Sequence, residues 1–144
     1  MKVEKQLSLL KKPLRKNLKT PYLTVDAIIE RNGKVLLISR KNPPLGWALP
    51  GGFVDYGESV SNALKREIKE ETSLIITSFS LLGVYSQPKR DPRFHTVSII
   101  YSVKVKGTPK AGDDAKEYQF FDLKKLPKLC FDHKRILNEY LKGK

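Results

Sequence analysis

The sequence predicts an α/β (α+β) fold in which helices cover a mixed β-sheet. Three observations indicate it: an Asn-Gly turn between two apolar runs, three further strand-like runs, and two segments with helical periodicity. Strands and helices that alternate in this order are typical of a layered domain. The 144 residues suffice for one domain with a core, and 40% hydrophobic residues indicate an ordinary globular protein.

The first predicted element is a β-hairpin. Residues 22–31 and 34–40 are rich in β-branched and aromatic residues. Asn32 and Gly33 between them favour the two positive φ angles of a type I′ turn. Pro43 and Pro44 follow the second run, and prolines end a strand ladder because they donate no backbone hydrogen bond.

Two helices are predicted, over residues 59–72 and 132–142. In the first, apolar residues recur at helical spacing and form one buried stripe: Val60, Ala63, Leu64 and Ile68. In the second, Asp132 is an expected N-cap, and Phe131 and Ile136 have hydrophobic-staple spacing. Strands are predicted over residues 80–86, 95–105 and 118–121.

The charge is strongly basic, with a formal net charge of +13. Residues 1–20 contain seven Lys or Arg and one Glu, which predicts a basic N-terminal arm or edge element before a single domain over residues 21–144. Such a surface suits an anion, either a nucleic acid or a phosphorylated small molecule; the alternative is a set of solvated lysines. We expect a cytoplasmic protein with no membrane contact, because no apolar run approaches about 18 residues and Cys130 has no cysteine to pair with.

A stripe of carboxylates lies on the first predicted helix. Glu67, Glu70 and Glu71 stand at i, i+3 and i+4, so they share one face, away from the apolar stripe. The stripe is either a solvated face with local ion pairs to residues such as Arg66, or a site for a hard cation. Clustered carboxylates suit Mg²⁺, which shares its coordination with water and substrate phosphates.

Residues 52–74 favour the second alternative, a cation site. They fit the spacing G-x5-E-x7-R-E-U-x-E-E-x-G-U, where U is aliphatic, through Gly52, Glu58, Arg66, Glu67, Ile68, Glu70, Glu71 and Leu74. This segment resembles the Nudix box of the Nudix hydrolases. Ser73 stands where the pattern has glycine. At that position after the helix, a left-handed conformation costs a residue with a Cβ about 1 kcal/mol. Serine there either carries this cost or makes the chain leave the helix by another route.

The resemblance implies an α/β/α sandwich that hydrolyses a nucleoside diphosphate linked to another moiety, with Mg²⁺ or Mn²⁺ as cofactor. In the family, the glutamates that match Glu67, Glu70 and Glu71 bind the metal, helped by the carbonyl that matches Gly52. The positions that match Glu58 and Arg66 orient those carboxylates. Metal ions suit this chemistry because they neutralise the charge with which a diphosphate repels a nucleophile.

Residues 47–58, 83–97 and 111–117 resemble the ADP-ribose pyrophosphatase subgroup, with Pro88 at its marker position. This implies cleavage of ADP-ribose to AMP and ribose 5-phosphate, and by analogy a homodimer. The alternatives within the family are an oxidised nucleoside triphosphate, a dinucleoside polyphosphate, a nucleotide sugar or an RNA 5′ end bound through residues 1–20. A non-catalytic module that senses ADP-ribose is the alternative of a different class.

Several flanking residues are candidates for contact with substrate. Trp47 and Tyr85 either stack on adenine or belong to the core. Three arginines are candidates for binding phosphate or the terminal ribose: Arg40, Arg90 and Arg93. The alternative is that they are solvated. Three loop acids are candidates for a general base or an extra metal ligand, and the alternative is that they anchor a turn: Asp113, Asp114 and Glu117. We expect His95 to be a packed or hydrogen-bonded residue.

Overall fold

The computed structural model describes residues 3–6, 19–112 and 115–143, so most of the predicted basic arm lies outside the described residues. The elements are β1 (Tyr22–Arg31), β2 (Lys34–Arg40), β3 (Trp47–Ala48), β4 (Gly51–Phe53), α2 (Val60–Thr72), β5 (Ile75–Tyr85), β6 (Thr96–Lys106), β7 (Ala115–Asp122) and α3 (His133–Lys142). The predicted mixed α/β architecture is confirmed. None of the helices in this described part combines the length and apolar character needed to cross a bilayer.

The sheet is mixed because β1 pairs with neighbours in both directions. It runs antiparallel to β2 across the Asn32-Gly33 turn and parallel to β6, which in turn pairs antiparallel with β5. The strand order is β3-β2-β1-β6-β5, with β4 beside β1 and β7 beside β2. Asn32 and Gly33 have φ of 53° and 76°, as the predicted turn requires.

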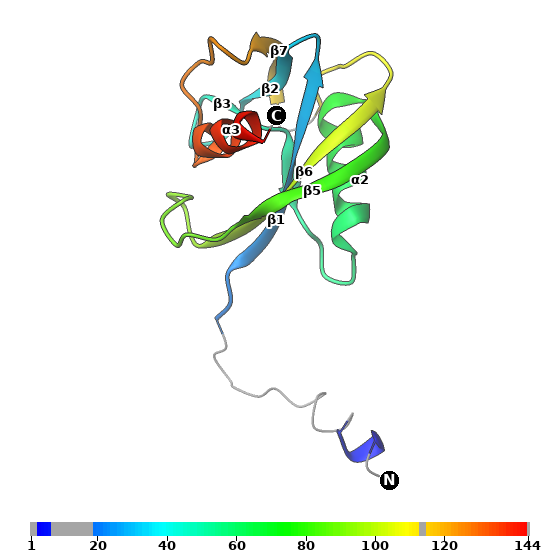
Figure 1. Ribbon diagram of the computed structural model, residues 1–144. Helices are drawn as coiled ribbons and strands as arrows, with labels where there is room; N and C mark the ends of the chain where they lie inside the picture. Colours follow the sequence, from blue (N-terminus) through cyan, green and yellow to red (C-terminus); the bar gives the residue numbers. More distant parts are fainter. Residues whose placement is uncertain (1–2, 7–18, 113–114, 144) are drawn as a thin grey trace.

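Alternation along β1 divides the core into two layers. Val25, Ala27 and Ile29 pack against the apolar stripe of α2, whereas Ile28 belongs to a second cluster that contains the apolar residues of α3. Successive side chains of a strand point to opposite faces, so α2 and α3 cover opposite faces of the sheet. Figure 1 shows the two helices separated by the strands. The predicted α/β/α sandwich is confirmed.

Some predicted boundaries are wrong. β5 begins at Ile75 rather than at residue 80, because this exposed segment is ordered by its pairing with β6 rather than by an apolar pattern of its own. β7 begins at Ala115, so Glu117 lies in a strand opposite Ser39 and not in a loop. The short strands β3 and β4 have no periodicity from which to predict them.

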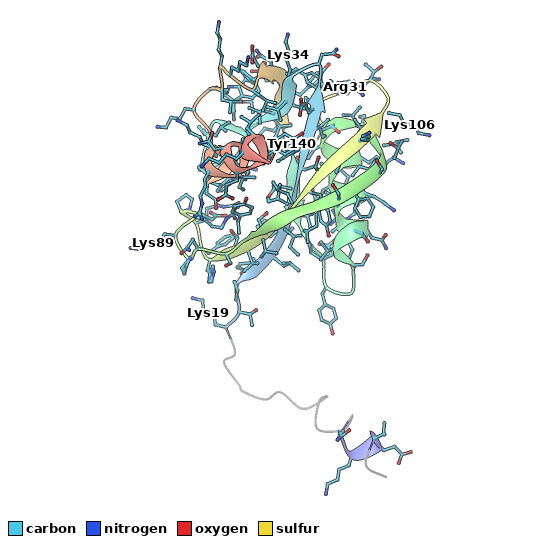
Figure 2. All side chains as sticks on the ribbon, viewed as in Figure 1. Lys19, Arg31, Lys34, Lys89, Lys106 and Tyr140 are labelled. Atoms are coloured by element: carbon cyan, nitrogen blue, oxygen red, sulfur yellow. The ribbon has the colours of Figure 1, made fainter. Side chains whose placement is uncertain are left out.

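Basic side chains are spread over the domain. The labelled Lys19, Arg31, Lys34, Lys89 and Lys106 lie on different sides of it (Figure 2). The described part of the chain therefore carries its positive charge over several surfaces.

A serine caps each end of helix α2. The Ser59 hydroxyl accepts a hydrogen bond from the Asn62 backbone N–H, which caps the first turn. At the other end, Ser73 has φ 63° and ψ 7°, and its N–H bonds the Lys69 carbonyl. Serine thus adopts the left-handed conformation for which the family pattern has glycine.

A Ser73→Gly variant is expected to be more stable than the wild type. Removing the Cβ from a left-handed residue relieves a cost of about 1 kcal/mol, which corresponds to a rise of about 3 °C in Tm. Urea unfolding and thermal denaturation measure the change. Ser73→Ala, which keeps the Cβ, is the control, and an equal gain in both variants would contradict the explanation.

Candidate active site

The acidic face of α2 meets the backbone of β4. The Gly51 N–H donates to Glu71 Oε2 at 3.0 Å. A Cβ added to Gly52 would lie 2.3 Å from Glu67 Oε2, so the Glu67 carboxylate rests against a backbone that only glycine leaves uncovered. Two carboxylates from successive turns of α2 are therefore held beside two consecutive glycines.

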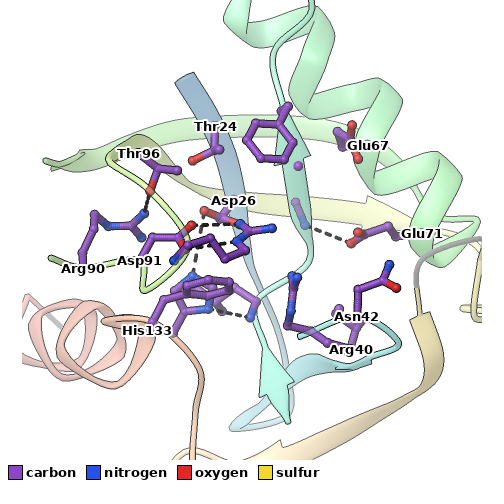
Figure 3. A pocket seen from close by; sticks show the side chains of 17 residues that line it. Thr24, Asp26, Arg40, Asn42, Glu67, Glu71, Arg90, Asp91, Thr96 and His133 are labelled. Carbon is purple, nitrogen blue, oxygen red and sulfur yellow. Dashed lines mark hydrogen bonds and ion pairs between the residues drawn. The ribbon is translucent and has the colours of Figure 1, made fainter. Parts of the chain in front are cut away.

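Glu67, Glu71 and Gly52 line one pocket, which extends from α2 to the segment that enters α3 (Figure 3). Its volume is about 220 Å³. The other lining residues come from β1, β2, β4, the start of β6, the start of α3 and the loops before β6 and α3. They include Thr24, Asp26, Arg40, Phe53, Arg90, Asp91, Arg93, Thr96, Phe131 and His133. One end of the pocket is thus acidic, and arginines and aromatic rings surround the remainder.

Arg66 organises the acidic end. It donates to both oxygens of Glu58, at 2.7 and 2.8 Å, and to Glu67 at 2.7 Å. It also contacts Glu70 at 3.3 Å and the Phe53 carbonyl at 3.0 Å. The hydrogen bonds from Arg66 lower the pKa of Glu58 to about 2. Arg66 and Glu58 therefore have the geometry expected of residues that orient the other carboxylates.

Of the three predicted glutamates, Glu67 and Glu71 line the pocket and Glu70 does not. Glu70 has a half-exposed side chain that contacts Arg66 and lies outside the pocket lining. In the described residues, no group of three His, Cys, Asp or Glu side chains is arranged to hold an ion. Mg²⁺ usually takes one or two carboxylates and completes its coordination with water and phosphate, so Glu67, Glu71 and the Gly52 carbonyl form a suitable oxygen donor set.

All three predicted arginines line the pocket, and neighbours hold the guanidinium groups of Arg40 and Arg93 in place. Arg40 donates from Nε to the Pro44 carbonyl at 2.9 Å, and its guanidinium lies 5.1 Å from the centre of the Phe131 ring. Burial lowers the pKa of Arg40. Arg93 forms an ion pair with Asp91 at 2.8 Å. Both guanidinium groups are thus held in fixed positions at the pocket.

Arg90 also lines the pocket, but its guanidinium group is buried in contacts with other protein groups. Its side chain is 3% exposed, and it donates to the Asp132 carboxylate at 2.7 Å and to Thr96 Oγ1 at 2.7 Å. These bonds fasten the loop before β6 to the start of α3. Asp132 is the N-cap residue of α3, as predicted, but its side chain makes no cap hydrogen bond because Arg90 binds its carboxylate. Phe131, the predicted staple residue, instead lines the pocket.

Trp47 and Tyr85 are not among the residues that line this pocket. Trp47 packs edge-on against Phe121, with ring centres 4.8 Å apart. The Tyr85 hydroxyl donates to Glu139 of α3, and burial, helped by Glu139, raises the pKa of Tyr85 to about 12. The structure therefore does not bring these two rings to the acidic end.

The remaining predicted residues are His95 and the three acids predicted to lie in a loop. His95 hydrogen-bonds the Ser86 carbonyl at 3.0 Å, as expected of a structural histidine. Glu117 is exposed on β7. Asp113 and Asp114 lie outside the described residues, so the expectation of a base at Asp114 stays a prediction.

Asp26 and His133 are two buried residues that line the pocket and were not predicted from the sequence. The Leu49 N–H donates to His133 Nδ1 at 3.0 Å, and His133 Nε2 lies 4.0 Å from Asp26, which also accepts from the Ser98 hydroxyl. Burial raises the pKa of Asp26 to about 6, whereas burial and nearby arginines lower the pKa of His133 to about 3. The only sequence signal is an acid within the apolar run of β1.

His133 makes the stability of the protein depend on pH. Its pKa falls from 6.5 to about 3 on folding, so below pH 6.5 the unfolded chain binds a proton that the folded protein does not. Stability is lost as the pH falls, by about 1.4 kcal/mol for each pH unit. We expect His133→Asn, whose amide oxygen can still accept from the Leu49 N–H, to lose this dependence.

Urea unfolding near pH 7 and again about one unit below pH 6.5 measures the effect. Asp26 titrates in the opposite direction, since its folded pKa is raised, but it is present in both proteins and largely cancels in the comparison. Equal losses of stability in wild type and His133→Asn would contradict the assignment.

The family model for the NUDIX domain matches residues 20–140 of the chain. The chain belongs to the Nudix family. This Nudix chain is 58% identical to an ADP-ribose pyrophosphatase of Methanocaldococcus jannaschii over 127 residues, which cover 86% of this chain and 75% of that protein. The predicted resemblance to the ADP-ribose pyrophosphatase subgroup is confirmed, and the protein is a Nudix hydrolase.

Solved structures of Nudix proteins show the same fold. The NUDIX domain of Shewanella oneidensis NrtR, complexed with ADP ribose, superimposes with a TM-score of 0.82 at 27% identity and covers 96% of this chain and 97% of that one. A MutT/nudix family protein from Enterococcus faecalis gives a TM-score of 0.85 at 32% identity, over 98% of this chain and 68% of that one.

Proposed function

We propose that this Nudix hydrolase cleaves ADP-ribose to AMP and ribose 5-phosphate with Mg²⁺ or Mn²⁺ as cofactor. The observation that carries the proposal is that carboxylates and arginines line the same pocket. Glu67, Glu71 and Gly52 lie at one end of it, and Arg40 and Arg93 lie beyond them. The high identity to an ADP-ribose pyrophosphatase supports the choice of substrate.

The residues of the pocket suit hydrolysis of a diphosphate. The oxygen of a water molecule bonds to phosphorus, the bond from that phosphorus to the bridging oxygen breaks, and the water gives up its proton. Before the reaction, the negative charge of the diphosphate repels the nucleophile. After it, the two anionic products repel each other. Arg40 and Arg93 offset that charge from fixed positions and orient the substrate.

Glu67, Glu71 and the Gly52 carbonyl would hold the divalent ion. When bound, it supplies neutralisation of the diphosphate charge and lowers the pKa of a coordinated water. Arg66 acts on this set as a positioning residue, because it holds Glu67 at 2.7 Å and the Phe53 backbone at 3.0 Å. Glu58 in turn fixes the Arg66 guanidinium through two hydrogen bonds.

Initial rates on a panel of substrates test the proposal. The panel contains ADP-ribose, a nucleotide sugar, a dinucleoside polyphosphate, an oxidised nucleoside triphosphate and a 5′-triphosphorylated RNA, each with Mg²⁺ and with chelator. The highest kcat/KM on ADP-ribose, lost with chelator, is the expected result. A higher kcat/KM on another compound would replace the substrate, and activity that withstands chelator would contradict the metal assignment.

We further propose that the protein is a cytoplasmic homodimer. The single cysteine supports a reducing compartment. β5 supports the dimer, because it ends the strand order of the sheet and exposes the apolar side chains of Ile75, Leu81 and Val84. Light scattering of the wild type and of Leu81→Lys tests this: a dimer in the first and a monomer in the second are expected, and a monomeric wild type would contradict it.

A further inference from the structure

Three aromatic rings form an exposed cluster, and one of them, Phe53, lines the pocket. Tyr22 at the start of β1 contacts Phe94 with ring centres 4.6 Å apart and Phe53 of β4 at 5.9 Å, and Phe53 lies 6.1 Å from Phe94. Tyr22 is 56% exposed, Phe53 37% and Phe94 39%. We call this cluster the aromatic platform.

The platform is continuous with the acidic end of the pocket. Phe53 follows Gly52 directly in β4 and itself lines the pocket. Its backbone carbonyl accepts a hydrogen bond from Arg66, the residue that also holds Glu67. The ring of Phe53 is thus anchored next to the donors proposed for the ion, so a group attached to a diphosphate bound there lies within reach of it.

Arg93 joins the platform to the rest of the pocket. Its guanidinium lies 5.0 Å from the centre of the Phe94 ring, 5.6 Å from that of Phe53 and 5.4 Å from that of Phe131. Asp91 accepts from its Nε at 3.1 Å and from its terminal nitrogen at 2.8 Å. The rings therefore border a fixed cation, an arrangement that suits a flat ring system attached to a phosphate.

From this geometry we infer that the aromatic platform stacks against the nucleobase of the substrate. The inference rests on the proposed function and deepens it, because it assigns the two ends of the substrate: the nucleoside to Phe53 and Phe94, and the terminal ribose phosphate to the side of Arg40 and Phe131. Bases stack on aromatic side chains through their π faces. The exposure of the three rings leaves these faces accessible to a base.

The test compares Phe53→Leu and Phe94→Leu with the wild type in steady-state hydrolysis of ADP-ribose. Loss of one stacking ring is expected to raise KM about 10- to 100-fold. The value of kcat should change far less, since the ion and the arginines remain. Phe53→Tyr, which keeps a ring, should restore KM. A fall in kcat without a rise in KM, or no change in either, would overturn the inference.

Product inhibition tests which end of the substrate lies on the aromatic platform. In Phe53→Leu, inhibition by AMP is expected to weaken as much as KM rises, and inhibition by ribose 5-phosphate to stay as in the wild type. Weaker inhibition by ribose 5-phosphate, with that by AMP unchanged, would overturn the assignment. The matched control is Phe79→Leu, a similarly exposed phenylalanine of β5 that contacts Tyr101 outside the pocket lining.

Calorimetric binding of AMP with Mg²⁺ separates this inference from the proposed function, because it requires no turnover. A wild type that does not hydrolyse ADP-ribose would end the proposed function. If AMP then still bound, and bound more weakly to Phe53→Leu than to Phe79→Leu, the platform would stand. Equal affinities in the two variants, or no binding of AMP to the wild type, would overturn it.

Discussion

A Glu71→Gln variant is expected to hydrolyse ADP-ribose about 10³-fold more slowly than the wild type with Mg²⁺ present, a loss of the size seen when one charge-stabilising group is removed from an active site. Glu71 lines the pocket and accepts from the Gly51 N–H at 3.0 Å. Glutamine keeps an oxygen that can accept this bond, so the fold should persist. It lacks the negative charge that a hard cation requires of its ligands.

Glu70→Gln is the comparison for this variant. The Glu70 carboxylate is half exposed, lies outside the pocket lining and contacts Arg66 at 3.3 Å. Its loss should lower kcat/KM far less than the loss of Glu71. Initial rates across a Mg²⁺ titration, with circular dichroism to verify folding, measure both. Equal losses in the two variants would mean that the three glutamates act as one set, and near-normal turnover in Glu71→Gln would remove it from the site.

A Gly52→Ala variant is expected to fold but to lose about 10²-fold in kcat/KM, a cost typical of disturbing the support of a metal ligand. The new Cβ would lie 2.3 Å from the Glu67 carboxylate. That carboxylate is the end of a flexible side chain and can move aside, so the cost falls on the site and not on the backbone. The Mg²⁺ concentration needed for half-maximal activity should rise as well.

Two other glycines provide controls for this prediction. A Cβ on Gly83 would lie 3.5 Å from the Tyr85 ring, an ordinary contact outside the pocket, so Gly83→Ala should keep wild-type kinetics. A Cβ on Gly51 would lie 2.1 Å from the Val25 carbonyl oxygen, which is backbone, so Gly51→Ala should lower the free energy of unfolding. Wild-type kinetics in Gly52→Ala would contradict the close contact between Gly52 and Glu67.

Elements whose signals are local could be predicted. The Asn32-Gly33 turn, the helix carrying the glutamates and its left-handed end at Ser73 all follow from the identities of a few neighbouring residues. β4 could not be predicted, because its three residues have no pattern of their own and exist as a strand through pairing with β1. For the same reason the first residues of β5, which depend on β6, were missed.

The candidate site divides in the same way. Periodicity and motif spacing within the sequence were sufficient to place Glu67 and Glu71 on one helical face and to associate them with Gly52, because about twenty residues contain the whole signal. Which other side chains meet them depends on contacts between distant segments. The ion pair of Arg90 with Asp132 and the bond from Leu49 to His133 join residues 42 and 84 positions apart.

By itself, therefore, the sequence determined the family, the acidic helix and the residues that orient its carboxylates. Only the tertiary structure decided that Asp26, His133, Phe53 and Phe131 line the pocket and that Trp47 and Tyr85 lie elsewhere. The physical reason is that helical periodicity is a property of neighbouring residues, whereas a pocket forms where the sheet and the segment entering α3 pack together. No local pattern records which side chains that packing brings face to face.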